Sequence, residues 1–138
     1  MKTFDKSSVS YELASRMIKA AMEKAEEIGL GVSVCIVDES GVLKAFGRMD
    51  NAPLMSVDAA RKKAVTAIGL GMPTGDAWYD FIKDDPILSA GVHNFADFLL
   101  LGGGSPISVE GRVVGAIGIS GGHYKQDEVC VKAALEIV

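Results

Sequence analysis

His93 and His123 are the only histidines in the chain, and a single imidazole can serve as an axial ligand to the metal of a haem or a corrin. His123 follows two glycines and precedes Tyr124, so a flexible backbone can present both side chains to a pocket. The structural alternative is that these are surface residues of loops. Two histidines without convergent carboxylates do not make a zinc site. We therefore take His123 as the candidate metal ligand and take both His123 and Tyr124 as candidate catalytic and ligand-binding residues.

The segment from Gly118 to Gly122 fits the G-x-S-x-G pattern of serine hydrolases and is predicted to lie between a strand and a helix. A hydrolase elbow needs an acid and a histidine later in the chain, but only a short tail follows Ser120 and His123 is three residues away. We interpret the segment as a glycine turn that brings backbone close to a neighbour or a ligand. Ser120 and Gly121 therefore join the candidate ligand-binding residues.

Three charged residues complete the candidate set. Arg48 and Asp50 end a predicted hairpin, and Lys63 lies on the next predicted helix, near a face of small residues. Either cation can hold a carboxylate, and the planar fork of Arg48 matches the two oxygens better. Lys63 is also a candidate catalytic residue. The structural alternative is that Arg48 and Asp50 brace the turn, while Lys63 passes the core with its ammonium in solvent.

Two further features do not point to chemistry. The glycine run 102–104 is not a phosphate loop, because no Lys-Ser/Thr pair follows it and it precedes a predicted strand rather than a helix. We therefore expect no nucleotide cofactor. Cys35 and Cys130 lack the spacing of a redox or zinc motif, so we expect two buried thiols.

The elements that must position these residues follow from hydrophobic periodicity. The pattern predicts helices over about 9–28, 56–68, 74–82 and 127–137, and hairpins over 32–48 and 107–120. Residues 87–98 show no clear period. Hairpins imply antiparallel pairing, so we predict an α+β fold in one domain spanning 1–138, with a single antiparallel sheet of about five strands covered by helices.

Composition narrows the class of partner. The 138 residues carry 14 Lys+Arg against 18 Asp+Glu, and the net charge of −4 argues against a nucleic-acid partner. No apolar run reaches the ~20 residues of a membrane span, and the polar N-terminus lacks a secretory core, so we expect a cytoplasmic protein without a membrane partner. The mean hydropathy of the chain, +0.26, is high for a sequence with so few aromatic residues. We therefore expect apolar surface to close against another subunit.

Taken in order, the motifs resemble the GlcG/HbpS-like haem-degrading domain family from about Leu13 to Leu135. The residues that carry the resemblance are Val34–Asp38 through Gly41, Arg48–Ala52, Ser56, Ala60, Lys63-Ala64, Thr66-Ala67, Gly103-Gly104, Pro106-Ile107, Gly111, Val113–Gly121 and Asp127. Two departures stand out. Asn51 replaces the usual glycine of the first motif, and Gly122-His123-Tyr124 stands where small residues are common.

The resemblance implies a profilin-like sheet flanked by helices, assembled as dimers to octamers. Its members include haem-binding proteins, the C-terminal part of PduO-type cobalamin adenosyltransferases and 4-hydroxylaminobenzoate lyases. We therefore expect a small homo-oligomeric protein that binds haem or a related tetrapyrrole at a subunit contact, with cobalamin ranked below haem. One alternative is a lyase acting on a small aromatic such as 4-hydroxylaminobenzoate. Another is an accessory subunit with no chemistry, so whether the protein is an enzyme stays open.

Overall fold

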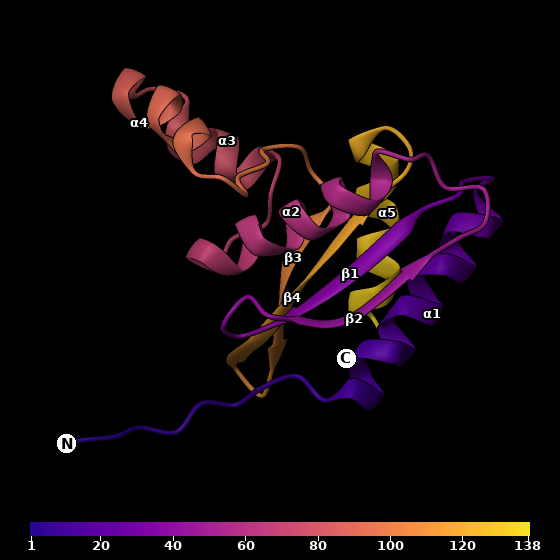
Figure 1. Cartoon of the computed structure of the whole chain (residues 1–138), viewed down its shortest axis with the longest axis horizontal. Helices are drawn as coiled ribbons and strands as arrows, with labels where there is room; N and C mark the ends of the chain where they lie inside the picture. Colours follow the sequence, from indigo (N-terminus) through magenta and orange to yellow (C-terminus); the bar gives the residue numbers. More distant parts are fainter.

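A computed structural model describes residues 1–138 and places one four-stranded antiparallel sheet between helices (Figure 1). The strands run in the order β2-β1-β4-β3, so the two hairpins meet through their inner strands β1 and β4. The elements are α1 (Tyr11–Glu27), β1 (Ser33–Asp38), β2 (Leu43–Arg48), α2 (Ser56–Leu70), α3 (Asp76–Ile82), α4 (Pro86–Gly91), the 3-10 helix η1 (Val92–Asn94), β3 (Gly104–Val109), β4 (Arg112–Ser120) and α5 (Tyr124–Leu135). The α+β class with a single antiparallel sheet is confirmed.

The predicted count of about five strands is wrong, because the two hairpins supply all four strands. The segment 87–98, which has no clear period, contributes short helices instead. Pro86 opens α4, and the carboxylate of Asp85 accepts hydrogen bonds from the N–H groups of Ile87 and Leu88 (2.9 and 3.0 Å). An aspartate cap followed by proline starts a helix at this position, so no strand can form there.

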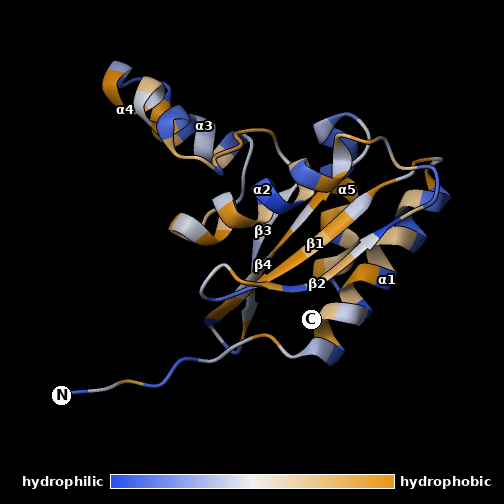
Figure 2. Cartoon of the chain, in the orientation of Figure 1, coloured by the Kyte–Doolittle hydropathy of each residue, from blue (hydrophilic) through white to orange (hydrophobic).

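The central strands β1 and β4 are buried on both faces of the sheet, whereas the edge strand β2 is largely exposed. Alternate residues of β1 point to opposite faces, with Val34 and Ile36 in the larger core cluster and Cys35 and Val37 in the smaller one. The larger cluster packs against α1 and α5, and the smaller one packs against α2. Figure 2 shows the central strands as a nearly continuous hydrophobic band, which matches a sheet covered on both sides.

Helix α2 approaches the sheet closely through a row of small residues. Ala60, Ala64 and Ala67 are fully buried, and a Cβ added at Gly118 of β4 would overlap the carbonyl oxygen of Ala60. The prediction that this helix presents small residues to a sheet is confirmed. The close approach places the next residue on that side of the helix, Lys63, directly above the end of β4.

Helices α3, α4 and η1 form an arm, residues 76–98, that projects from the body past α2 (Figure 1). Trp78 packs edge-to-face on Phe98 with ring centroids 5.2 Å apart, in a small core of its own. Thr66 of α2 anchors the arm, because its hydroxyl accepts from Leu99 N–H and donates to Asp97 O. None of the helices is long and apolar enough to cross a membrane.

Candidate functional site

Lys63 and Asp127 form a buried ion pair that joins the helices on the two faces of the sheet. Both side chains are almost completely excluded from solvent, and Lys63 Nζ lies 2.9 Å from Asp127 Oδ2. The other carboxylate oxygen, Oδ1, accepts the N–H of Gly122 (3.0 Å). The structural alternative of an ammonium in solvent is therefore wrong, because the side chain of Lys63 turns inward to Asp127 of α5.

The ammonium of Lys63 also completes the sheet. Ile119 of β4 donates its N–H to Gly103 O (2.8 Å), while Ile119 O accepts from Lys63 Nζ (2.9 Å). In a longer β3 a backbone N–H would donate to Ile119 O, and here the ammonium of Lys63 donates in its place. Gly103 has φ +116, and a Cβ there would meet Lys63 Nζ and the Asp127 side chain. The glycine run is needed because backbone passes directly over the ion pair.

Burial lowers the pKa of the Lys63 ammonium, and the charge and hydrogen bond of Asp127 oppose that shift. Two of the three N–H donors of the ammonium are directed at protein oxygens, Ile119 O and Asp127 Oδ2. Such a pair orders the surrounding backbone, and the backbone of Gly103 passes directly beside the ammonium. The ligand-binding and catalytic roles predicted for Lys63 stay predictions, and what the structure shows is a buried residue that holds backbone in place.

His123 lies at the N-terminus of α5 and caps it. Its Nδ1 accepts the N–H of Lys125 (3.1 Å), and Gln126 Oε1 accepts the N–H of His123 (3.0 Å). This capping box starts the helix at Tyr124, three residues before the predicted start. The ring centroids of His123 and Tyr124 lie 4.5 Å apart, so the structure brings this predicted pair together, with His123 exposed and Tyr124 half-buried.

The cap restricts what His123 can coordinate. A neutral imidazole carries its proton on one nitrogen, so an Nδ1 that accepts a hydrogen bond leaves the proton on Nε2. Metal coordination through Nε2 requires that proton to move to Nδ1, which ends the bond to Lys125 N–H. Coordination by His123 therefore competes with the cap of α5, which is worth about 1 kcal/mol.

Arg48 and Ser120 lie on one face of the sheet, in one row that runs across the strands. Both are paired directly opposite Ser33 across the strands, and directly opposite residues point to the same face. Ser33 Oγ lies 2.8 Å from Ser56 Oγ at the start of α2, so the shared face is the one that α2 covers. Arg48 is exposed and has no ion pair in the chain.

The remaining two candidates lie apart from this row. Asp50 is exposed and lines a wide surface hollow of about 770 Å³ beside α1. Gly121 packs against another backbone segment, because a Cβ there would overlap the carbonyl oxygen of Gly31. The close backbone contact expected of residues 118–122 is therefore confirmed, but the turn is shorter than predicted, because Gly118–Ser120 belong to β4 and only Gly121 and Gly122 form the bend.

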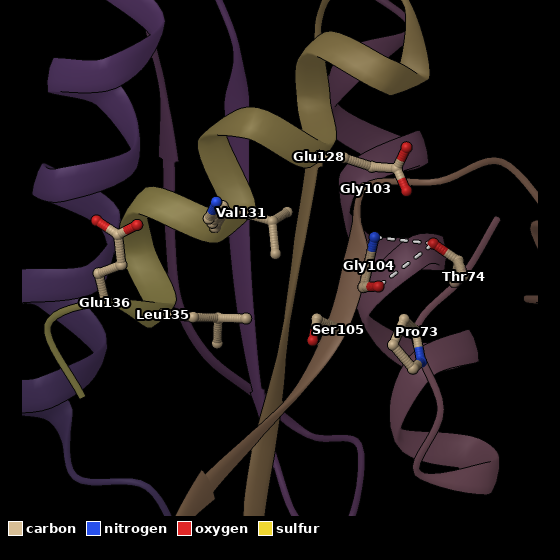
Figure 3. Close-up of a pocket in the computed structure, with 10 residues that line it drawn as sticks. Pro73, Thr74, Gly103, Gly104, Ser105, Glu128, Val131, Leu135 and Glu136 are labelled. Atoms are coloured by element: carbon tan, nitrogen blue, oxygen red, sulfur yellow. Dashed lines mark hydrogen bonds between the residues drawn. The ribbon is translucent and has the colours of Figure 1, made fainter. Parts of the chain in front are cut away.

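One hollow of about 360 Å³ lies between α5 and the glycine run (Figure 3). Val131 and Leu135 of α5 line one side, and Pro73 and Thr74 line the other. The Thr74 hydroxyl accepts the N–H of Gly104 (2.8 Å), which fixes that wall. The lining combines apolar side chains with the charged residues Glu128, Lys132 and Glu136, and none of the predicted ligand-binding residues is among its members.

A second cavity, of about 460 Å³, is apolar and lies between α2 and the arm. Nine of its twelve lining residues are hydrophobic. We call it the arm cavity, and its lining consists of Val65, Thr66, Gly69, Leu70, Trp78, Phe81, Leu88, Val92, Phe95, Ala96, Asp97 and Phe98. Its size falls in the range of small-molecule sites, about 300–1,000 Å³. Four aromatic rings at one cavity favour a flat apolar ligand.

The arm cavity has one polar group that is paired within the protein and one that is not. Asp97 is paired, because its carboxylate accepts from the Arg61 guanidinium at 2.9 Å, which lowers the pKa of Asp97. The indole Nε1 of Trp78 is buried and has no hydrogen-bond partner. An unpaired buried donor costs about 1–3 kcal/mol, and an acceptor brought by a ligand would remove that cost.

Sequence reasoning missed the arm cavity, and it left His93 with no role beyond that of a surface residue of a loop. The segment that carries them has aromatic residues at irregular spacing, and this was the only available signal.

The two thiols, in contrast, are as expected: Cys35 and Cys130 are free and buried, and burial raises their pKa to about 12 and about 11. Such thiols remain protonated and unreactive at neutral pH.

Comparison with known proteins places the chain in a family. An uncharacterized 15.0 kDa protein of Citrobacter freundii is 31% identical over 129 residues, which cover 94% of this chain and 91% of that protein. The corrinoid adenosyltransferase PduO of Citrobacter freundii is 30% identical over 131 residues. That match covers 95% of this chain but only 39% of PduO, so the chain corresponds to part of the larger enzyme.

Solved structures agree with the sequence relatives. The crystal structure of Klebsiella pneumoniae protein ORFY has a TM-score of 0.91 at 28% identity, covering 99% of this chain and 94% of that one. The structure described as a PduOC:heme complex has a TM-score of 0.85 at 28% identity, covering 95% of both chains. The family model described as haem degrading protein HbpS-like matches residues 9–136. With nearly its whole length matched, this chain belongs to the HbpS-like family.

Proposed function

We propose that this protein binds haem or a closely related tetrapyrrole in the arm cavity. The observation that carries the proposal is the cavity itself, with its apolar lining and its aromatic rings from both α3 and the segment that follows η1. A porphyrin is a rigid, flat and largely apolar molecule, so it suits walls of this kind. The haem complex of the PduOC structure supports the choice of ligand class.

Each part of the lining has a role toward such a ligand. The aromatic walls exclude water from the ring faces, and the Trp78 N–H is available to a ligand oxygen. Arg61 neutralises Asp97, so the one carboxylate of the lining does not repel an anionic ligand as a free charge would. Bound haem supplies an iron that accepts an axial ligand.

We also propose that the chain works as a homo-oligomer, from a dimer to an octamer. Large apolar side chains are exposed at the start of α2 and on the arm: Leu54 and Met55 are 89% and 85% exposed, and Ile87 and Phe95 are 85% and 72% exposed. Large apolar side chains exposed at these two places favour contacts with another subunit. Sedimentation velocity of the purified protein tests this, and a monomer at all concentrations would contradict it.

Titration with haemin, followed at the Soret band, tests haem binding. We expect a saturable shift at one haem per subunit or per dimer, and a featureless, non-saturating response would refute the proposal. Gly69 lines the arm cavity, and a Cβ added there meets no atom within 4 Å. Gly69→Phe should therefore weaken haemin binding without disturbing α2. Val57→Phe, on the same helix outside the cavity, is the matched control.

A second candidate function is binding and turnover of a small aromatic carboxylate. The observation that favours it is Arg48, which has no partner in the chain and faces the same side as Ser33 and Ser120. Loss of 4-hydroxylaminobenzoate, followed by liquid chromatography, tests this role, with His123 and Tyr124 as the proton carriers. Arg48→Lys should abolish turnover, whereas Arg16→Lys on exposed α1 should not. No turnover by the unaltered protein would end this candidate.

A further inference from the structure

The two edges of the sheet differ in whether another strand can be added to them. At β3, Gly104 O accepts the N–H of Thr74 (3.0 Å), and the N–H of Gly104 donates to the Thr74 hydroxyl (2.8 Å). The next outward-facing residue of β3 is Pro106, which has no N–H to donate. The edge of β3 is therefore closed to a further strand, and β2 is the open edge of the sheet.

The backbone of β2 presents unpaired hydrogen-bonding groups along its outer edge. Met49 N–H donates to Val32 O (3.0 Å), which identifies a bonded position of the β1–β2 ladder. Bonded positions alternate along an antiparallel pair, so the N–H and C=O groups of Phe46 and Arg48 point away from β1. Because β2 has no second neighbouring strand, these groups form a template for pairing with another chain.

Helix α2 leaves the side chains of β2 open to solvent. Phe46 is paired directly opposite Cys35, whose side chain packs against α2, so the ring of Phe46 lies on that same face. Arg48, two residues further along the strand, faces the same way. The helix packs on β4, β1 and β3 but leaves β2 largely uncovered, and Phe46 is 36% exposed. An exposed ring beside unpaired backbone groups favours the addition of another strand.

The charges of β2 are complementary to those of a second, antiparallel copy of the same strand. Lys44, Arg48 and Asp50 are exposed, and none of them has an ion pair within the chain. With a two-fold axis through Gly47, Phe46 lies opposite Arg48 of the second copy, and Lys44 comes level with its Asp50. An axis through Phe46 would instead place Lys44 opposite Arg48 of the second copy, so like charges would meet on both sides.

We infer that β2 is the docking strand for a second copy of this chain, which joins the two sheets into one continuous sheet across a two-fold axis at Gly47. The inference rests on the proposed homo-oligomer and names the surface that forms one of its contacts. Phe46 of each copy exchanges backbone hydrogen bonds with Arg48 of the other. On each side of the axis the side chains add an arginine–aromatic contact and an ion pair between Lys44 and Asp50.

Two charge reversals test both the surface and its register. Lys44→Asp and Asp50→Lys each bring like charges together on both sides of the axis, so each should weaken association roughly tenfold. The matched control is Lys2→Asp, which makes the same charge change at an exposed residue outside the sheet. Sedimentation velocity over a range of protein concentrations measures the association, and far-UV circular dichroism confirms that each variant is folded.

An equimolar mixture of Lys44→Asp and Asp50→Lys is the most specific test. In a mixed pair each reversed residue meets the opposite charge, so the mixture should associate as the unaltered protein does, whereas neither variant should do so alone. Phe46→Pro removes an outward N–H without removing a bond to β1, as Pro106 does at the other edge, and should also lower the sedimentation coefficient. If Phe46→Pro does not fold, the charge reversals, which alter only exposed side chains, decide alone.

Failure of the homo-oligomer and failure of this contact give different results. If the unaltered protein is a monomer at all concentrations, the proposed homo-oligomer is wrong, and the contact through β2 with it. If it is an oligomer that neither charge reversal weakens, the oligomer forms through another surface and the inference is overturned. If both reversals weaken it but their mixture does not associate, the register centred on Gly47 is wrong.

Discussion

Replacing Lys63 by methionine is a direct test of how the fold is held together at the end of the sheet. Methionine has a similar length but no charge, so Lys63→Met leaves the Asp127 carboxylate and Ile119 O without their 2.9 Å partner inside the protein. Removing one member of a buried ion pair costs about 3–5 kcal/mol. Because domains are stable by only about 5–15 kcal/mol, this is a large part of the total free energy of unfolding.

Urea denaturation followed by far-UV circular dichroism measures the effect. With a slope of about 2 kcal/mol per molar urea, a loss of about 4 kcal/mol lowers the midpoint by about 2 M. The slope itself should stay the same, because the exposed area on unfolding does not change. The neighbouring variant Lys62→Met is the matched control, since Lys62 pairs with Asp58 at 3.1 Å on the exposed side of α2. An exposed pair contributes about 0–1 kcal/mol, so this midpoint should move little.

The double variant Lys63→Met/Asp127→Asn shows whether the cost comes from the uncompensated charge. Asparagine keeps an oxygen for the N–H of Gly122 but carries no charge. The double variant should therefore be more stable than Lys63→Met alone, with a coupling energy of about 1–3 kcal/mol. A midpoint for Lys63→Met equal to that of Lys62→Met would refute the reasoning, because the pair would then contribute no more than a surface pair.

Three further outcomes follow from the same contacts. His123→Ala should lower the free energy of unfolding by about 1 kcal/mol in urea titration, and His123→Asn, which can still cap, should restore it. Gly118→Ala should lower the free energy of unfolding by about 1–3 kcal/mol, because the added methyl overlaps the backbone of α2. Gly69→Ala should raise it by about 0.5–1 kcal/mol, because the added methyl has open space. Equal urea midpoints for these two variants would contradict the reasoning. Arg61 lowers the pKa of the Asp97 carboxyl in the folded protein. The stability that ionised Asp97 contributes is therefore present above about pH 4 and is lost as the pH falls through the lowered pKa. In Asp97→Asn the free energy of unfolding should therefore fall less steeply over this acid range than in the unaltered protein.

The parts of the fold that sequence predicts well are those with long periodic patterns. The four strands and helices α1 and α2 were expected at nearly their observed positions, because 6 to 17 residues are enough to show a period of 2 or 3.6. Helices α4 and η1 have 6 and 3 residues, too few for any period to be visible.

The candidate site was predicted less well, for a related reason. Lys63 and Asp127 are 64 residues apart, so nothing local in the sequence shows that they meet. Small residues around Lys63 indicated close packing but were compatible with an ammonium in solvent. His123 was singled out for its neighbours, yet those same glycines and Gln126 also make it a helix cap. His93 had no informative neighbours in a pattern, and only the folded arm shows which rings surround it.

The single tryptophan of the chain lies in the arm, where its small core has three buried residues against fifteen in the main cluster. So small a core gives the arm a lower opening free energy than the sheet. Intrinsic fluorescence therefore reports detachment of the arm, while circular dichroism reports melting of the whole molecule, and the fluorescence transition should come first on heating. A segment that detaches without unfolding the sheet would also open the proposed haem site beside α2, so the contacts that hold the arm would control ligand entry while the main core controls global stability.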